Sequence, residues 1–192
     1  MARRNDFRPD SQGTGDFGKL LLTKKQRRNL LRWSLYALVC LFGLLLQDVI
    51  LCRITLFDAA LDIVPCLILM VCILQGAEDG SLFILVAACF YYFSGSAPGV
   101  YVIPILVTVG VLLVIFRQAY MSQGFFTILF SSAFGMLVYE MCVFGIGLFL
   151  GLTNSLRLKS FAITALISLI VVPFAYPIFI SIGKIGGDTW KE

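Results

Sequence analysis

Long runs of apolar residues, separated by short polar connectors, dominate the chain from residue 33 onwards. An α-helix needs roughly 20 mainly apolar residues to cross the hydrocarbon core of a bilayer, so this pattern predicts membrane-spanning helices. Open strands are not expected to span lipid, because their edges would leave backbone groups without hydrogen-bond partners. We therefore predict an all-α, polytopic transmembrane helical bundle of about six helices. The predicted helices cover residues 33–52, 60–75, 81–93, 99–116, 124–150 and 161–182.

Prolines and short connectors refine this prediction. Pro65 falls near the start of the second helix, where the first turn tolerates proline. Pro104 is expected to kink the fourth helix, and Pro173 and Pro177 are expected to bend or break the sixth. The turn at 76–80 is short, so the second and third helices should be antiparallel neighbours. Both are shorter than a full span, which leaves five spans or a re-entrant pair open as alternatives.

The composition agrees with a lipid environment. Hydrophobic residues make up 59% of the chain and charged residues 14%, with a mean hydropathy of +0.94. A water-soluble core of this size would leave too much apolar surface exposed. The chain divides into a basic N-terminal tail at 1–29, expected to be cytoplasmic, and a transmembrane helical domain at 30–187.

Basic residues predict the orientation of the bundle. With six spans, all of the 15 Lys and Arg residues except Arg53, Arg157 and Lys159 fall on one side of the membrane. An excess of Lys and Arg marks the cytoplasmic side, so both termini are expected there. The run at 24–28 should also attract anionic lipid headgroups. Nucleic acid is not an expected partner, because this run adjoins a membrane span and has no folded platform.

Few ionisable groups lie at membrane depth, where charge is costly and frequently functional. Glu140 lies beyond the midpoint of the fifth helix, directly after Tyr139. We expect Glu140 to face the bundle interior, a cavity or a partner protein, or to be protonated. Asp48 follows Gln47 near the end of the first helix, where it can pair with Arg53 or stay hydrated.

The other polar and aromatic features suggest no enzyme. Glu78 and Asp79 lie in the 76–80 turn, where they either favour the start of the next helix or contact a cytoplasmic partner. The aromatic run at 90–93 is typical of an interfacial belt. The six cysteines are expected to be small packing residues. The chain has no histidine and no catalytic or metal-binding motif, so neither an enzyme nor a cofactor site is expected.

The order of several features resembles the rod shape-determining MreD family over about residues 30–155. The features are the end of the first helix at 45–51, the opening of the second at 62–65 with Pro65, the Gly76–Gly80 turn with its acids, the turn at 94–99, Arg117 at the end of the fourth helix, and the segment 137–140. The chain departs from this family in its long basic tail and in the aromatic run at 90–93, where many relatives have a Gly- and Asp-bearing stretch.

This resemblance implies a non-enzymatic subunit of the bacterial inner membrane that acts in cell elongation, cell shape and cell-wall biogenesis. It implies a fold similar to the S components of energy-coupling-factor vitamin transporters. It further implies association with an MreC-like protein, and through it with the elongation peptidoglycan synthase complex and an MreB-like filament. The candidate partner or cavity residues are Glu140, Tyr139, Asp48, Gln47, Pro65, Glu78 and Asp79.

Two other functions remain as alternatives. A vitamin-binding S component would share the architecture, but the first helix lacks the small-residue stripe with which S components dock their transport module. Ala37 is its only alanine between residues 33 and 44. An intramembrane enzyme or ion carrier built on Glu140 is disfavoured by the lack of histidine and of a second central acid.

Overall fold

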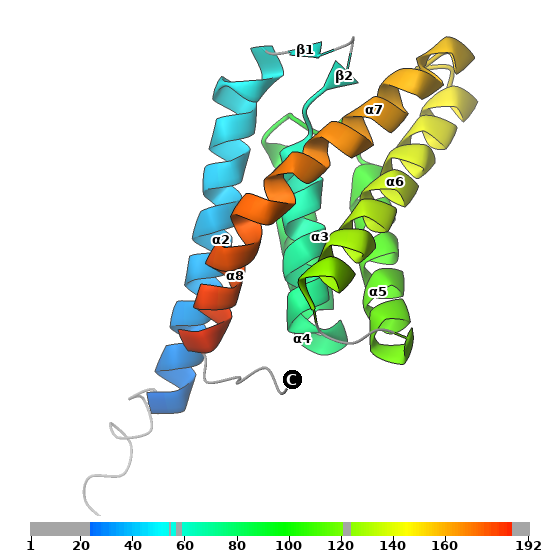
Figure 1. Cartoon of the computed structure of the whole chain (residues 1–192). Coiled ribbons are helices and arrows are strands. Elements are labelled where there is room, and N and C mark those ends of the chain that lie inside the picture. The colour runs from blue at the N-terminus through cyan, green and yellow to red at the C-terminus, as the bar shows by residue number, and fades with distance from the viewer. Residues whose placement is uncertain (1–23, 54, 57–58, 121–123, 186–192) are drawn as a thin grey trace, which may run out of the picture.

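A computed structural model describes residues 24–53, 55–56, 59–120 and 124–185 of the chain. Over these residues the backbone forms a bundle of six helical rods (Figure 1), which confirms the all-α fold class. The rods are α2 (Lys24–Val49), α3 (Ile63–Gln75), α4 (Ala77–Phe93), α5 (Val102–Tyr120), α6 (Phe125–Phe149), and a broken last rod of α7 (Leu158–Ser168) and α8 (Val172–Ile185).

Short elements join the rods. Three 3-10 turns, η1 (Leu51–Arg53), η2 (Ser155–Arg157) and η3 (Leu169–Val171), follow α2, precede α7 and separate α7 from α8. The two-residue strands β1 (Thr55–Leu56) and β2 (Ala59–Ala60) pair antiparallel between α2 and α3. This hairpin lies at one end of the bundle and does not cross it (Figure 1). We refer to that end as the hairpin end and to the opposite end as the Lys24 end.

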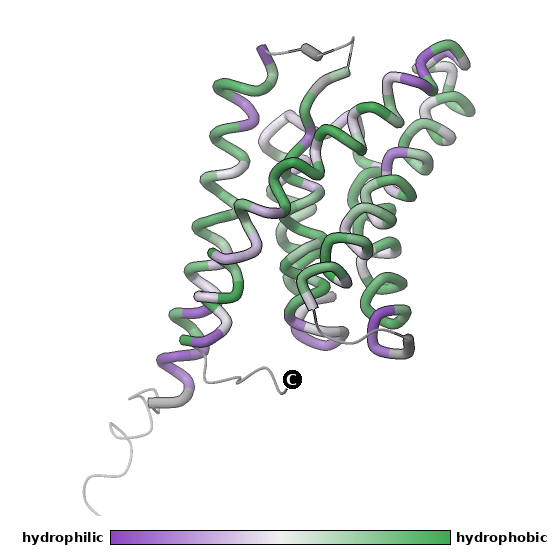
Figure 2. Tube along the Cα trace, in the orientation of Figure 1, coloured by the Kyte–Doolittle hydropathy of each residue, from purple (hydrophilic) through white to green (hydrophobic). Residues whose placement is uncertain are grey.

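The bundle has the surface of a membrane protein. Three helical segments are long and apolar enough to cross a membrane, namely Gln26–Arg53, Phe125–Phe149 and Ser155–Ile185. Hydrophobic residues predominate along these rods (Figure 2), and many of the large ones are exposed; Phe42, Phe130 and Phe174 are each more than 60% exposed. Contiguous apolar surface of this extent is favourable against lipid rather than water.

Helix α3 is the core of the bundle. Every residue from Ile63 to Leu74 is buried, and α3 packs against α2, α4, α5 and α6. An apolar surface all round the helix explains why the other rods surround it. With 13 residues, α3 is only about 20 Å long at 1.5 Å per residue, so it does not span a hydrocarbon core of about 30 Å. Both of its ends therefore lie among the other helices.

Two predicted boundaries are wrong. Helix α2 begins at Lys24 rather than at residue 33, so the described part of the predicted tail, 24–29, is helical; residues 1–23 lie outside the described residues. Helix α4 begins at Ala77, so the predicted turn at 76–80 reduces to Gly76, whose positive φ of 92° reverses the chain. Glycine adopts this conformation without the steric cost that other residues carry.

The prolines act according to their position within each helix. Pro65 lies in the first turn of α3, as predicted. Pro104 lies in the first turn of α5 rather than in its interior, so the predicted kink is wrong: the first turn needs no donor at that position. The last rod breaks at η3, just before Pro173, as predicted, because proline removes a backbone donor and clashes with the preceding turn. Pro177, also predicted to bend or break this helix, lies inside α8, which continues past it to Ile185.

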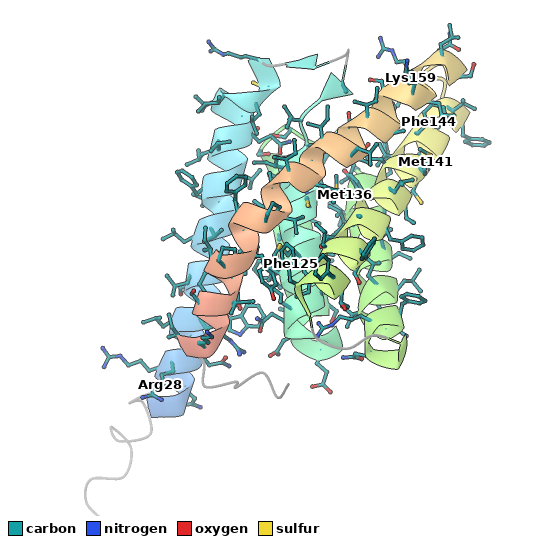
Figure 3. The ribbon with its side chains drawn as sticks, in the orientation of Figure 1. Arg28, Phe125, Met136, Met141, Phe144 and Lys159 are labelled. Carbon is teal, nitrogen blue, oxygen red and sulfur yellow. The ribbon has the colours of Figure 1, made fainter. Side chains whose placement is uncertain are left out.

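The described chain enters and leaves the bundle at the same end. Lys24 and Ile185 both lie at the Lys24 end (Figure 1), because the chain runs through an even number of rods. Arg28 lies at this end and Lys159 at the hairpin end (Figure 3). These two basic residues thus mark opposite ends of the bundle.

Candidate functional site: the Asp62 cluster

Four of the six rods, together with the residue that precedes α3, contribute polar side chains to one cluster near the N-terminus of α3. Its members, which we call the Asp62 cluster, are Gln47 on α2, Asp62 before α3, Tyr91 on α4, Tyr139 and Glu140 on α6, and Ser168 on α7. Three of the sequence-predicted residues, Gln47, Tyr139 and Glu140, meet here. Apart from Asp62, which is partly exposed, the members are at most 6% exposed.

Gln47 caps α3 from a neighbouring helix. Its Oε1 accepts hydrogen bonds from the backbone N–H groups of Ile63 (3.1 Å) and Val64 (3.0 Å). The third residue of the helix is Pro65, which has no N–H to satisfy. The first-turn donors of α3 that would otherwise be unpaired in an apolar surrounding are thereby satisfied by one amide.

Asp62 lies at the centre of the cluster. Its Oδ1 accepts a 2.7 Å hydrogen bond from Nε2 of Gln47, and its Oδ2 accepts a 2.6 Å hydrogen bond from the Tyr91 hydroxyl. Its backbone N–H donates to Oγ of Ser168 at 3.2 Å. The positive end of the α3 dipole also favours a negative charge at this position.

Tyr139 and Glu140 approach the same point from α6. Tyr139 is 1% exposed and lies within hydrogen-bonding reach of the Tyr91 hydroxyl. Glu140 is 4% exposed and close enough to Asp62 for the two carboxyls to interact electrostatically. Among the residues that the structure describes, no hydrogen bond or ion pair is found for the Glu140 side chain. Because only 4% of its surface is exposed, the Glu140 side chain faces the bundle interior.

Asp48 lies outside this cluster. Its half-buried carboxylate accepts a hydrogen bond from Oγ of Ser96, in the connector between α4 and α5. An ion pair with Arg53, one of the two alternatives from the sequence, does not form within the described part of the chain. This hydrogen bond therefore links α2 to the connector between α4 and α5 at the hairpin end.

Glu78 and Asp79 lie far from the cluster, at the Lys24 end. Both occupy the first turn of α4, where acidic side chains favour the helix N-terminus. Asp79 Oδ2 lies 3.7 Å from Nη2 of Arg32, whose guanidinium stacks over the ring of Trp33 at 5.6 Å. The seven predicted candidates, including Pro65 in α3, therefore divide between the two ends of the bundle.

Arg117 caps the other end of α3. Its side chain is 6% exposed, and its Nη1 donates a hydrogen bond to the carbonyl oxygen of Ile73 in the last turn of α3. A cation at a helix C-terminus also complements the helix dipole. Side chains from α2 and α5 thus provide hydrogen-bond partners for backbone groups at the two ends of α3.

Two central members of the cluster, Asp62 and Tyr91, were not predicted as site residues. Asp62 carried one signal, since an Asp three residues before Pro65 and at the start of an apolar run is typical of a helix N-terminus. Tyr91 was assigned to an interfacial belt, but it is fully buried, whereas Phe90 (62%) and Phe93 (80%) are exposed. Ser168 carried no signal of its own beyond its position shortly before Pro173.

The described residues contain no cluster of metal-ligating side chains. Within 24–53, 55–56, 59–120 and 124–185, no group of three or more His, Cys, Asp or Glu could hold a metal ion. The six cysteines are free thiols. Cys40, Cys66 and Cys72 are buried packing residues, as predicted, whereas Cys89 is half-buried and Cys52 and Cys142 are exposed, so the prediction is wrong for those two. Comparison with protein-family models, with curated proteins and with solved structures finds no match for this chain.

Proposed function

We propose that this protein is a non-enzymatic, multi-pass subunit of a bacterial inner membrane, of the MreD type, that acts in cell elongation by binding partner membrane proteins. Its direct partner would be an MreC-like protein. Contact with the elongation peptidoglycan synthase complex and an MreB-like filament would be indirect. Both termini would lie in the cytoplasm, on the side of the basic residues.

One observation carries this proposal. Features on which the resemblance rests are widely separated in the sequence, yet they converge on helix α3. Gln47 caps its N-terminus and binds Asp62, Pro65 lies in its first turn, Arg117 caps its C-terminus, and Tyr139 is buried on α6, which packs against it. The proposal rests on this convergence of the features that carry the resemblance.

The apolar outer surface supports binding as the mode of action. A partner's transmembrane helix would pack against an exposed face, with contributions of about 0.5–2 kcal/mol from each interhelical polar contact. Three exposed phenylalanines lie on different rods, so each can be used to test one face of the bundle for partner contact. They are Phe42 on α2, Phe130 on α6 and Phe174 on α8.

Photo-crosslinking from native membranes tests the proposal. The full chain, tagged and carrying a benzophenone amino acid at position 42, 130 or 174, is irradiated in its source cells and purified. An MreC-like protein is expected in the adduct from one face, while lipid covers the others. The matched control carries the probe at the fully buried Phe179, where no partner reaches it.

Other outcomes would contradict the proposal. The absence of an MreC-like adduct from all three faces, together with its absence from the copurifying proteins, would exclude the proposed partner. A copurifying vitamin or transport module would instead support the S-component alternative. Depletion of the protein should give rounded cells if the proposal holds, and cells that keep their rod shape would count against it.

A further inference from the structure

The corner where α6 meets α7 combines exposed apolar side chains with exposed basic ones. We call residues 149–159 the α6–α7 tip; it lies at the hairpin end, apart from α2 (Figure 1), and Figure 3 labels its last residue, Lys159. Arg157 and Lys159 are exposed and form no ion pair with a described residue. Five large apolar side chains of the tip are 45–90% exposed, namely Phe149, Leu150, Leu152, Leu156 and Leu158.

The turn that ends α6 keeps its apolar side chains outward. Gly151 adopts a φ of 70°, and its N–H donates to the carbonyl oxygen of Leu148 at 3.1 Å. The N–H of Leu152 donates to the carbonyl oxygen of Gly147 at 2.8 Å. At such helix ends the residue in the place of Leu152 frequently packs back onto the last turn. Because its acceptor is here a glycine without a side chain, Leu152 remains 66% exposed.

Aromatic packing joins α6 to α7 below the tip. The rings of Phe144 and Phe161 meet edge to face, with their centroids 5.4 Å apart, and the two helices pack against each other. The tip is therefore the end of a packed helical hairpin. Its leucines are displayed by hydrogen-bonded backbone and not by a loop that could fold them inward.

Neither water nor hydrocarbon is a favourable solvent for this combination of side chains. In water, Leu156 and Phe149 would leave 85% and 90% of their surfaces hydrated, which is unfavourable for apolar groups. In hydrocarbon, the charges of Arg157 and Lys159 would be costly. Helix α6 has 25 residues and is about 37 Å long, so it extends beyond a core of about 30 Å. The headgroup region accommodates both kinds of side chain, because apolar groups insert there beneath basic ones.

The charge of the tip selects the kind of lipid. No Asp or Glu occurs between residues 141 and 187, so no acid near in sequence compensates Arg157 and Lys159. A basic residue close to a bilayer surface favours anionic over neutral lipid about fivefold. We infer that the α6–α7 tip is a docking surface for anionic phospholipid headgroups in the leaflet at the hairpin end. The basic run at 24–28 lies at the opposite end, and the inference does not depend on the proposed partner.

Photo-crosslinking in nanodiscs tests the docking surface. The full chain, carrying a benzophenone amino acid at position 156, is reconstituted with equal amounts of phosphatidylglycerol and phosphatidylcholine that have the same acyl chains. The mass of the adduct identifies the lipid. We expect phosphatidylglycerol adducts to exceed phosphatidylcholine adducts at least about fivefold. The matched control carries the probe at the exposed Phe130 in the middle of α6, where the two lipids should react about equally.

Charge variants assign the preference to the two basic residues. The double variant Arg157→Gln with Lys159→Gln should bring the adduct ratio at position 156 close to one. Arg53→Gln removes an exposed basic residue at the hairpin end but outside the tip, and it should keep the wild-type ratio. All three positions are exposed, so the variants should fold, and the wild-type ratio tests the inference without them.

Four results would overturn the inference. They are the absence of a lipid adduct at position 156, which would place the tip in water; a wild-type ratio close to one; a ratio that the double variant does not change; and a protein as the main adduct in source membranes, which would assign the tip to a protein partner. The proposed function is tested by adducts from positions 42, 130 and 174, so the two proposals can fail separately.

Discussion

Nε2 of Gln47 donates a 2.7 Å hydrogen bond to Oδ1 of Asp62, and this contact ties the end of α2 to the residue that begins α3. The same amide accepts the backbone donors of Ile63 and Val64 through its oxygen. The Gln47 side chain on α2 therefore uses both its donor and its acceptor to bind the start of α3. The start of α3 is fixed by this contact rather than by a cap from its own residues, since Asp62 makes no side-chain cap.

Replacing Gln47 with alanine should strongly destabilise the bundle. The substitution would leave two N–H groups and a carboxylate oxygen without partners, and each unsatisfied buried group costs about 1–3 kcal/mol. We expect a loss of about 3 kcal/mol, measured by thermal or denaturant unfolding in nanodiscs. Asp48→Ala is the matched control, because its half-buried side chain contacts only a loop and should cost much less. Equal losses in the two variants would show that the cap is not important.

The C-terminal end of α3 gives a second prediction. Arg117→Leu removes the donor to the Ile73 carbonyl and the cation near the helix C-terminus. We expect a destabilisation of about 1–3 kcal/mol, with Arg117→Lys intermediate because it keeps the charge but not the guanidinium. Arg157→Leu, at an exposed position in η2, should leave the unfolding midpoint almost unchanged. A Leu variant as stable as the wild type would contradict the capping role.

The positions of the helices were predictable, and the contacts among them were not. Apolar runs determine where each rod lies, and the breaks before Pro173 and at Gly76 follow from backbone chemistry. The start of α2 was not predicted because residues 24–29 are all polar, although helix propensity and the adjoining apolar run continue the helix to Lys24.

The site was only partly predictable, because its contacts join distant parts of the chain. The hydrogen bond between Asp62 and Ser168 spans 106 residues, and no local pattern signals such a pair. Glu140 and Gln47 were identifiable, because polar groups are rare within apolar runs. Tyr91 was hidden among neighbouring aromatic residues, and its inward orientation depends on the rotation of α4 about its axis.

Two helical glycines provide a matched test of packing. A Cβ on Gly80 would lie 2.8 Å from the carbonyl oxygen of Cys72, where backbone cannot move aside easily, whereas a Cβ on Gly145 would meet nothing within 4 Å. Gly80→Ala should therefore destabilise the protein by about 1–3 kcal/mol through overpacking of α4 against α3. Gly145→Ala should be neutral or stabilise by up to about 1 kcal/mol, because alanine is the better helix former. Unfolding midpoints in nanodiscs measure both, and a stabilising Gly80→Ala would show that the two helices do not approach so closely.

Cysteine accessibility tests the orientation that the proposed function requires. Cys52 is exposed in η1 at the hairpin end, whereas Cys40, Cys66 and Cys72 are buried. If the hairpin end faces outward, a membrane-impermeant maleimide should label the wild-type protein in intact cells.

The labelling needs two matched variants. Cys52→Ser should abolish the signal, since Cys142 is exposed on the apolar surface of α6, where lipid covers it. Adding Lys184→Cys to Cys52→Ser, at an exposed position in α8 near the Lys24 end, should restore labelling only after the cells are permeabilised. Labelling of this double variant in intact cells would place the basic end outside, against the charge rule on which the orientation rests. The proposed contacts with the wall-building machinery would then have to be reassigned.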